Sequence, residues 1–233
     1  MSGAFPLPPA RLLPFLYLAS PSLPVGAFSW SQGLAPACAA NLVHNAASLR
    51  EWLMNVLRFG LGNLDVPILF RCCGAAAEDD AERFFYWNDM LLAGRESAEL
   101  WSEEDQMGKA LCRLLRGQRL LPAWMNGRNC GYVAAFALGA TRLCASLGVG
   151  HSAGETACAF VWSWLENQAV CACKCLPLGQ TAVQHILLDI MPHIPKILDK
   201  AARRKDDEVG ASLPGLAIAS AAHERLYGRM FRS

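Results

Sequence analysis

Hydrophobic residues recur at helical spacing along most of this chain, and no segment shows the sustained apolar-polar alternation of a half-buried strand. The clearest apolar stripe lies after Ser48 and comprises Leu49, Trp52, Leu53, Val56 and Leu57. The four residues from Ser48 to Glu51 also match a capping box, in which both end side chains satisfy free backbone amides. The pattern therefore predicts a helix that begins at Ser48.

Similar patterns predict helices through the rest of the chain. Ser102 is expected to open one of them, with Glu103, Glu104 and Asp105 in its first turn, where acidic groups suit the positive end of the helix dipole. The predicted helices start near residue 29 and otherwise span about 48–57, 82–92, 102–115, 132–147, 155–176, 180–191, 194–204 and 216–231. The turn-rich segment 117–131 is the candidate hinge.

The order of these elements predicts an all-α fold, a single-domain helical bundle of roughly ten helices. We expect one domain over residues 10–233, preceded by a flexible, proline-rich N-terminus over residues 1–9. The 53% hydrophobic fraction of the 233 residues can supply a large core.

Charge gives no sign of a nucleic-acid partner. The formal net charge is +1, and the basic run at 203–205 is followed at once by the acidic run at 206–208, so it is expected to be a solvated turn. The ten cysteines are read as reduced thiols of a cytoplasmic protein, because disulfide frameworks are typical of short secreted chains.

Two apolar segments raise the question of a membrane. Residues 12–19 follow Arg11 and have the outline of a short signal peptide, which is the less favoured interpretation. Residues 154–176 approach the length of a membrane span but contain Glu155, Glu166 and Lys174, which are costly in lipid. A buried core helix is the better prediction, and no membrane partner is expected.

Motifs for chemistry are largely missing. Gly108-Lys109 lacks the upstream glycine and the following hydroxyl residue of a phosphate-binding loop, and no serine lies in a nucleophile elbow. Cys171 and Cys175 share one face of a predicted helix, but two thiols are at best half of a metal site, and packed core thiols are the favoured alternative. We therefore predict no catalytic residue, no metal site and no cofactor.

Polar groups in apolar surroundings are the remaining signal. Glu166, Asn167 and Gln168 follow two indoles on a helix suited to burial, so they either join helices or line a cavity or interface, with the structural role favoured. The tail combines cationic, aromatic and methionine side chains, which are enriched in interfaces. The tail residues concerned are Arg225, Leu226, Tyr227, Arg229, Met230, Phe231 and Arg232.

Several blocks of this sequence resemble the family of urease accessory proteins called UreF. The first runs from Leu18 through Pro21-Ser22-Leu23-Pro24-Val25-Gly26 to Gly33-Leu34. Further blocks are Arg95-Glu96-Ser97 with Gln106-Met107-Gly108, Trp162 to Gln168, Pro177-Leu178-Gly179-Gln180, and the tail from Pro214 to Ser233. They follow the family order from about residue 13 to the end.

The resemblance implies an all-α, non-catalytic protein that forms a homodimer, binds UreD (also called UreH) and recruits the GTPase UreG to apo-urease during nickel insertion. On this basis UreD/UreH is expected to bind the tail at Arg225, Tyr227, Arg229, Met230, Phe231 and Arg232. A dimer or UreG-facing surface is expected at Gly26, Ser29, Ser31, Gln32, Arg95, Glu96, Glu166 and Gln168. One departure from the family pattern is Ala35, which stands where an acidic residue is common.

Two other functions remain open from the sequence. A tail arginine could stimulate UreG as an arginine finger supplied in trans. Alternatively, the chain could be a small helical-bundle enzyme that uses Glu166 or a cysteine on an organic substrate. Turnover by the isolated protein would favour the enzyme, whereas a scaffold requires its partners.

Overall fold

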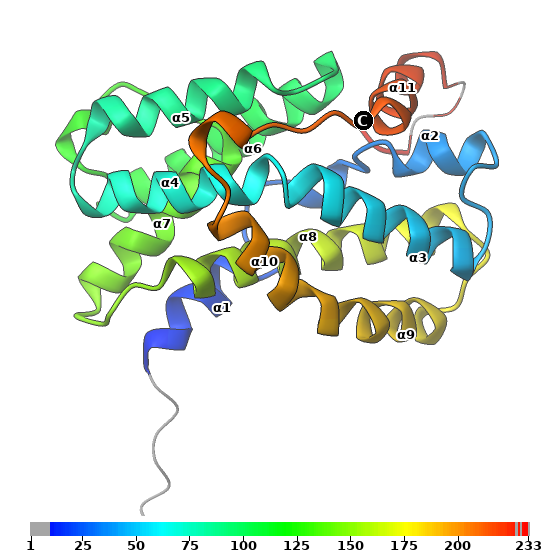
Figure 1. Ribbon diagram of the computed structural model, residues 1–233, viewed down its shortest axis with the longest axis horizontal. Coiled ribbons are helices and arrows are strands. Elements are labelled where there is room, and N and C mark those ends of the chain that lie inside the picture. The colour runs from blue at the N-terminus through cyan, green and yellow to red at the C-terminus, as the bar shows by residue number, and fades with distance from the viewer. Residues whose placement is uncertain (1–9, 227, 229, 233) are drawn as a thin grey trace, which may run out of the picture.

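The computed structural model describes residues 10–226, 228 and 230–232, and over these residues it is helical with no strand (Figure 1). The α-helices are α1 (Leu13–Ala19), α2 (Leu34–Ala39), α3 (Ala46–Asn55), α4 (Asp65–Ala77), α5 (Ala81–Ala93), α6 (Ala98–Gly117), α7 (Tyr132–Ser146), α8 (Ala153–Cys175), α9 (Gln180–Ile190), α10 (Ile194–Ala202) and α11 (Pro214–Ala222). The all-α prediction is confirmed. The predicted flexible segment 1–9 lies outside the described residues.

Helices α4, α7 and α8 form the centre of the fold. Helix α4 packs against α5, α7, α8 and α10, and α7 is buried along most of its length. In Figure 1, α3 and α4 follow one another across the middle of the molecule, with α5 beside α4 and α9 beside α3. The sequence analysis did not predict α4, in which Pro67 and Gly74 are residues that usually interrupt a helix.

The predicted bounds of α5 and of α7 to α10 agree with the structure to within three residues. The start predicted for α3 is wrong. Asn45 is the N-cap, its Oδ1 accepts the backbone N–H of Ser48 at 2.9 Å, and Ser48 Oγ accepts the N–H of Asn45 at 3.1 Å. Ser48 therefore holds the third helical position of a capping box that begins three residues earlier than expected.

The start predicted for α6 is also wrong. Ser97 caps this helix by accepting the N–H of Leu100 at 3.1 Å, so the helix begins before the acidic run. Glu103 and Glu104 consequently lie in the second turn, and both are buried rather than exposed near the helix start. This correction places two carboxyl groups inside the protein.

Two further helical predictions need correction. No α-helix begins near Ser29, where Ala27–Ser29 forms a single 3₁₀ turn (η2) instead. The last α-helix ends at Ala222 and not at residue 231, since His223–Arg225 forms a 3₁₀ turn (η7) and the chain then turns away. The described residues after Arg225 are therefore not helical, and Arg232 reaches the backbone of Ser29.

Helix α3 continues as a π-helical turn, η3 (Val56–Leu61), before the chain bends by 44° into α4. Such turns are uncommon and are frequent at functional sites. No single described helix is long and apolar enough to cross a membrane, and only the bent pair Ala46–Leu61 with Asp65–Ala77 reaches that length and composition.

The segment predicted to be a hinge is packed onto the bundle. Met125 is fully buried, and Arg116 Nη2 donates to the carbonyl oxygen of Arg128 at 2.7 Å. The helices on either side, α6 and α7, also pack against each other. Whether the segment moves stays a prediction.

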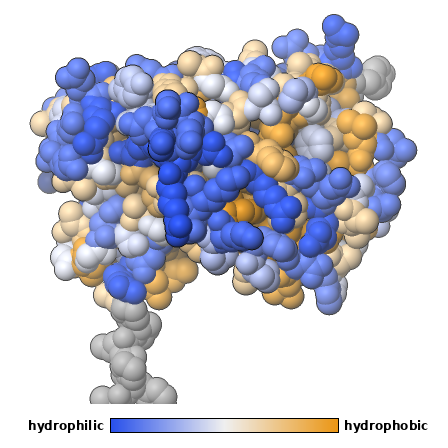
Figure 2. All heavy atoms as spheres, in the orientation of Figure 1, coloured by the Kyte–Doolittle hydropathy of each residue, from blue (hydrophilic) through white to orange (hydrophobic). Residues whose placement is uncertain are grey.

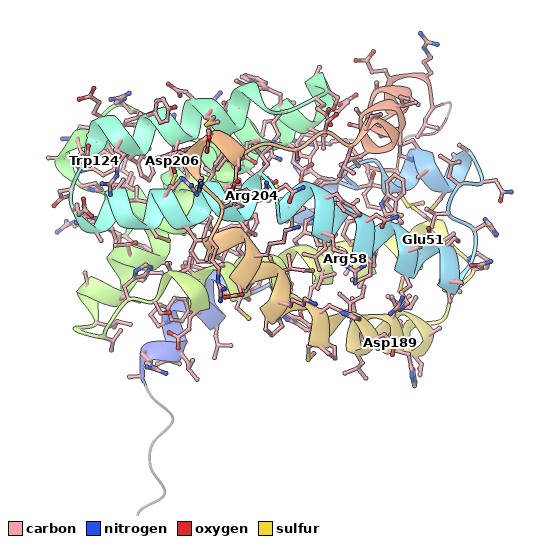
Figure 3. The ribbon with its side chains drawn as sticks, in the orientation of Figure 1. Glu51, Arg58, Trp124, Asp189, Arg204 and Asp206 are labelled. Carbon is pink, nitrogen blue, oxygen red and sulfur yellow. The ribbon has the colours of Figure 1, made fainter. Side chains whose placement is uncertain are left out.

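The basic and acidic runs at 203–208 form a turn, as predicted, but it is tied to the body. Arg204 Nη2 donates to Asn63 Oδ1, and Arg71 Nη2 pairs with Asp206 at 2.5 Å. Figure 2 shows hydrophilic atoms gathered over this turn. Figure 3 shows Arg204 and Asp206 in the segment between α10 and α11, residues 203–213, which we call the strap. Helix α11, which follows the strap, packs against α2 and α6.

Candidate functional site

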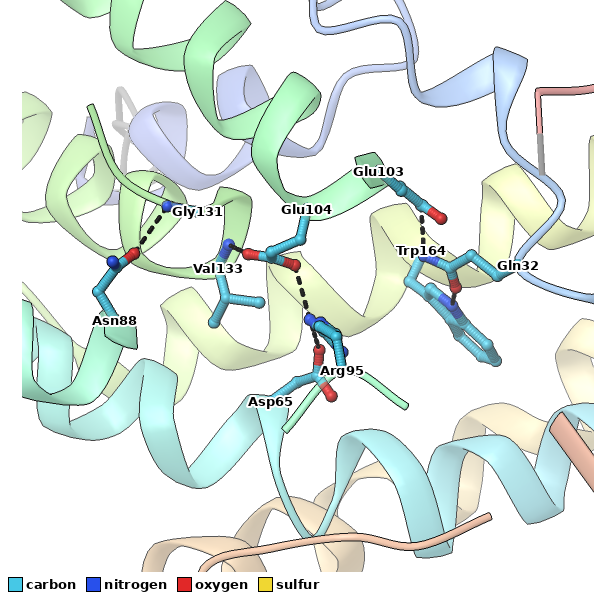
Figure 4. Close-up of polar contacts among 9 residues, drawn as sticks. All are labelled: Gln32, Asp65, Asn88, Arg95, Glu103, Glu104, Gly131, Val133 and Trp164. Carbon is cyan, nitrogen blue, oxygen red and sulfur yellow. Dashed lines mark hydrogen bonds and ion pairs between the residues drawn. The ribbon is translucent and has the colours of Figure 1, made fainter. Parts of the chain in front are cut away.

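A cavity of about 160 Å³ lies between the loop that follows α1, the turn η3, and helices α6 and α8. Its walls are mostly apolar, with Leu23, Val56 and Leu213 among the lining residues. The polar groups of the lining form two clusters, which Figure 4 draws together. A largely apolar cavity with a few converging polar groups is the usual form of a binding site.

The first cluster centres on Arg95, which lies in the short connection between α5 and α6. Arg95 Nη2 is 2.6 Å from Asp65 Oδ1 and 2.6 Å from Glu104 Oε2. Burial alone would lower the pKa of Arg95, but the two carboxylates raise it above its ordinary value. Burial raises the pKa of Glu104, against the effect of Arg95. The three groups form a buried ion triad in which each charge depends on the others.

The triad also fixes the start of α7. Gly131, the N-cap residue, has no side chain to cap the helix, and Glu104 Oε1 accepts the N–H of Val133 at 2.8 Å in its place. Asn88 Oδ1 accepts the N–H of Gly131 at 2.7 Å (Figure 4). A carboxylate at a helix N-terminus is favourable because it faces unpaired amides and the positive end of the dipole.

The second cluster is a chain of three side chains from three elements. Glu103 Oε1 accepts Gln32 Nε2 at 2.6 Å, and Gln32 Oε1 accepts the indole N–H of Trp164. Burial raises the pKa of Glu103 to about 8, although the hydrogen bond from Gln32 favours the charged form. Its other oxygen, Oε2, is buried without a partner. Glu103 can therefore hold a proton near neutral pH inside the cavity.

The tail is joined to the loop after α1 at a contact surface that we call the tail seam. The backbone N–H of Arg232 donates to the carbonyl oxygen of Ser29 at 2.7 Å, and Arg232 Nη1 donates to Gln106 Oε1 at 3.1 Å. The ring of Phe231 is only 5% exposed and lies 5.3 Å from Lys174 Nζ. The structure thus brings together two of the predicted partner-binding regions.

The remaining tail residues are placed differently. Met230 is 66% exposed, and Arg225 is also exposed. Tyr227 and Arg229 were predicted to contact the same partner, and both lie outside the described residues. Exposed Met230 beside buried Phe231 means that the seam presents one apolar side chain outward and anchors the tail with the next.

Four of the eight residues predicted for the dimer or UreG-facing surface line the cavity, namely Gln32, Arg95, Glu96 and Glu166. Glu96 binds the start of α11, since its carboxylate accepts Ser212 Oγ at 2.8 Å and the N–H of Leu213 at 2.9 Å. Gln168 is fully buried and both atoms of its amide lack a partner. Glu166 lines the cavity and is half-buried.

Three others of this set, Gly26, Ser29 and Ser31, lie within the loop between α1 and α2. Gly26 has a φ of +76°, in the left-handed region that favours glycine, and it begins the turn that exposes Phe28. Ser31 is fully buried, and its Oγ accepts the N–H of Ala35 at 3.3 Å. Ser29 contributes its carbonyl oxygen to the tail seam. The loop is therefore held from within while its outer edge stays accessible.

Sequence reasoning missed the centre of the site. Asp65 was not singled out, and Glu103 and Glu104 were assigned to the first turn of a helix, where they would suit the helix dipole. The available signals were a lone aspartate that opens the apolar segment 65–77 and a glutamate pair near a plausible serine cap. Neither signal identifies its partner, because these residues meet only through long-range packing.

In the described part of the chain, no group of three or more histidine, cysteine, aspartate or glutamate side chains is arranged to hold a metal ion. Cys171 is buried, and its Sγ donates to the carbonyl oxygen of Trp30 at 3.4 Å. Cys175 forms a hydrogen bond with the thiol of Cys38. These two cysteines therefore belong to the packing of α8 against the loop and α2.

Comparison with known proteins gives a consistent answer over nearly the whole chain. The family model described as UreF matches residues 43–191. The urease accessory protein UreF of Chromohalobacter salexigens is 44% identical over 226 residues, which are 97% of this chain and 96% of that protein. Proteins of the same name from Pseudoalteromonas translucida and Marinobacter nauticus are 42% and 43% identical, over 95% of this chain and 94% of each relative.

Proposed function

This chain belongs to the UreF family of urease accessory proteins, and from that premise we propose that it acts as a non-catalytic scaffold of urease maturation in the cytoplasm. In this proposal it works as a homodimer, binds UreD/UreH, and recruits and regulates the GTPase UreG on apo-urease while nickel is inserted. No metal or cofactor of its own is needed for that role.

The tail seam is the observation that carries the proposal. Chain ends usually fray unless something ties them down. This tail is anchored by Phe231 and by the backbone of Arg232, yet Met230 of the tail and Phe28 of the loop remain more than 60% exposed. Exposed Met and Phe side chains next to an arginine are the composition of a protein interface.

We therefore place the UreD/UreH contact at the tail seam. The test is to delete residues 230–233 and measure co-purification of the variant with UreD/UreH. The deletion is expected to abolish co-purification while leaving the helical content unchanged. Arg203→Ala, which alters an exposed arginine in the turn after α10, is the matched control. Unchanged UreD/UreH binding by the deletion variant would refute this placement.

A UreG-facing or dimer surface is proposed separately for the loop and the cavity mouth. Ser29→Ala and Glu166→Ala remove side-chain polar groups without touching the Ser29 carbonyl that anchors the tail. Weaker UreG binding, or a shift toward monomer in sedimentation, is the expected result. Wild-type UreG affinity together with an unchanged oligomeric state would remove this second surface from the proposal.

Regulation of UreG is tested by its GTP turnover with and without this protein. Arg232 is the described tail arginine nearest to the exposed Met230, so Arg232→Ala is the variant to compare with wild type. A rise in turnover that depends on Arg232 would support an arginine supplied in trans. Equal turnover with wild type, with the variant and without either would exclude it.

One observation favours the alternative of an enzyme. Glu103 faces a cavity with a pKa of about 8 and a free carboxyl oxygen, which suits a general acid or base. Turnover of an organic substrate by the isolated protein, lost in Glu103→Gln, would replace the scaffold proposal. Urease activation measured with UreD/UreH, UreG and this chain, and with this chain omitted, separates the two functions directly.

A further inference from the structure

Two buried cysteines lie together away from the tail seam. Cys112 is in the last third of α6, and Cys130 comes just before α7. Their Sγ atoms are 3.6 Å apart, and the residues are 0% and 6% exposed. Neither takes part in the proposed scaffold surface.

The backbones that carry the two thiols touch each other. Gly108 lies one turn before Cys112 on the same face of α6, and a Cβ at Gly108 would lie 2.1 Å from the carbonyl oxygen of Cys130. A disulfide requires Cβ atoms about 4 Å apart and an S–S distance of about 2 Å. The two Sγ atoms, which are 3.6 Å apart, must therefore move closer for the bond to form, and the contact between the two backbones favours this approach.

The pair is also chemically unequal. The hydrogen bond between the two thiols lowers the pKa of Cys112, with Arg116 acting in the same direction against the effect of burial. The pKa of Cys130 is raised well above its ordinary value by the same hydrogen bond and by burial. One thiol of the pair can therefore carry the negative charge while the other donates a hydrogen bond to it, which is the arrangement of an attacking and a resolving cysteine.

Access to the pair is narrow but present. A hollow of about 270 Å³ opens on the surface beside α5 and the segment before α7, and Cys130 is among its lining residues together with Asn88, Lys109 and Arg128. Because Cys130 is 6% exposed and Cys112 is fully buried, only a small oxidant can approach. Hydrogen peroxide meets that condition, whereas a disulfide such as oxidised glutathione does not.

We propose that Cys112 and Cys130 form a reversible two-cysteine oxidation site for peroxide. The thiolate of one cysteine of the pair attacks one peroxide oxygen, the O–O bond breaks, and the products are a sulfenic acid on that cysteine and hydroxide, which takes up a proton to become water. The sulfur of the other cysteine then attacks the sulfenic sulfur, a disulfide forms, and a second water leaves. Overall, two thiols are oxidised and one peroxide is reduced to two waters.

The bond has a defined structural consequence. It links positions 18 residues apart and fastens the start of α7 to α6. Val133 donates to Glu104 three residues after Cys130, so the cross-link secures the part of α7 that the ion triad positions. Oxidation is therefore expected to restrict the motion of the start of α7 relative to α6 and to leave the tail seam unchanged.

The test uses the full chain in its reduced state. The protein is exposed to hydrogen peroxide, free thiols are blocked with N-ethylmaleimide under denaturing conditions, and the digest is analysed by mass spectrometry. The expected product is a linked peptide containing Cys112 and Cys130 that has lost two hydrogen atoms and is separated by dithiothreitol. Oxidation should also raise the unfolding midpoint by about 5 °C or more, reversibly.

Other thiols in the same chain provide the controls. Cys158 is exposed, and the pair Cys38 and Cys175 is half-buried, so oxidised glutathione is expected to modify these and to leave Cys112 and Cys130 reduced. Cys158→Ser should retain the peroxide-induced link, while Cys112→Ser and Cys130→Ser should each lose it together with the shift in midpoint.

The wild-type digest alone can overturn the proposal, which protects the test from variants that fail to fold. Cys112 and Cys130 recovered with N-ethylmaleimide on both, after peroxide has oxidised Cys158, would refute it. Recovery of Cys112 as an unlinked sulfinic acid, or linked to a different cysteine, would refute it equally. Loss of the link in either serine variant with wild-type folding would confirm the assigned pair.

Discussion

The ion triad and the tail seam each depend on an arginine, but the two arginines work in opposite surroundings. Arg95 lies between two carboxylates that are almost fully buried, whereas Arg232 lies on the surface against Gln106 and the ring of Trp30. An uncompensated charge is very costly in the first setting and cheap in the second. The triad should therefore govern stability, and the seam should govern binding.

The largest effect is expected from breaking the triad. Arg95→Ala leaves Asp65 and Glu104 buried without a counter-charge, and removal of one partner from a buried ion pair costs about 3–5 kcal/mol. Urea unfolding measured by circular dichroism gives the free energy of unfolding. The matched control is Arg203→Ala, because the pair of Arg203 with Asp199 is largely exposed and should contribute little. Equal losses in the two variants would contradict the comparison.

The next largest effect on stability is expected at Gly108, where the backbone of α6 closely approaches the backbone that precedes α7. Gly108→Ala places a methyl group 2.1 Å from a backbone oxygen that cannot move without shifting the start of α7. We expect a loss of about 1–3 kcal/mol in the free energy of unfolding. Gly117→Ala in the same helix meets no atom within 4 Å and should be neutral or slightly stabilising. The difference in the free energy of unfolding between the two alanine variants measures the cost of separating α6 from the segment that precedes α7.

These two regions also differ in how far the sequence could predict them. Hydrophobic spacing predicted α5 and α7 to α10, because each of these helices contains both apolar and polar residues and is bounded by proline, glycine or a capping side chain. It missed α4, in which nine of thirteen residues are buried and Pro67 and Gly74 interrupt the helical pattern. It also placed the start of α6 too late, since Ser97 and Ser102 are equally plausible caps until packing selects one.

The candidate site also has parts that local sequence predicts and parts that depend on tertiary packing. The loop and the tail were recognised from short motifs that persist in a linear sequence, and the structure brings Ser29 and Arg232 together there. The triad joins Asp65, Arg95 and Glu104 from three separate elements. Each of these residues is ordinary in its local context, so only the tertiary fold reveals the cluster. Likewise, nothing in the local sequence pairs Cys112 with Cys130.

A pH titration sharpens the comparison within the cavity. The pKa of Glu103 rises from 4.5 in the unfolded chain to about 8 in the folded protein, so the folded state binds more protons between these values. Stability from this group is fully present below about pH 4.5 and is lost as pH rises through 8. The free energy of unfolding should fall by up to about 1.4 kcal/mol per pH unit within that window.

Glu103→Gln isolates this contribution, since glutamine keeps an acceptor for Gln32 but cannot ionise. Wild type should lose stability relative to the variant as the pH is raised from 5 to 8, in paired urea titrations. Parallel pH profiles for the two proteins would show that Glu103 titrates at its ordinary pKa.

The smallest effect on stability is expected at the tail seam, where it is most informative. Arg232→Ala removes the side-chain contacts to Gln106 and Trp30 but keeps the backbone N–H that donates to Ser29, so the free energy of unfolding should change by less than about 1 kcal/mol. The tail should nevertheless open more often, and hydrogen exchange of the amide at position 232 should become faster. Arg225→Ala should leave that amide unchanged. If Arg232→Ala destabilised the whole protein as strongly as Arg95→Ala, the seam would belong to the core, and its assignment to binding would be wrong.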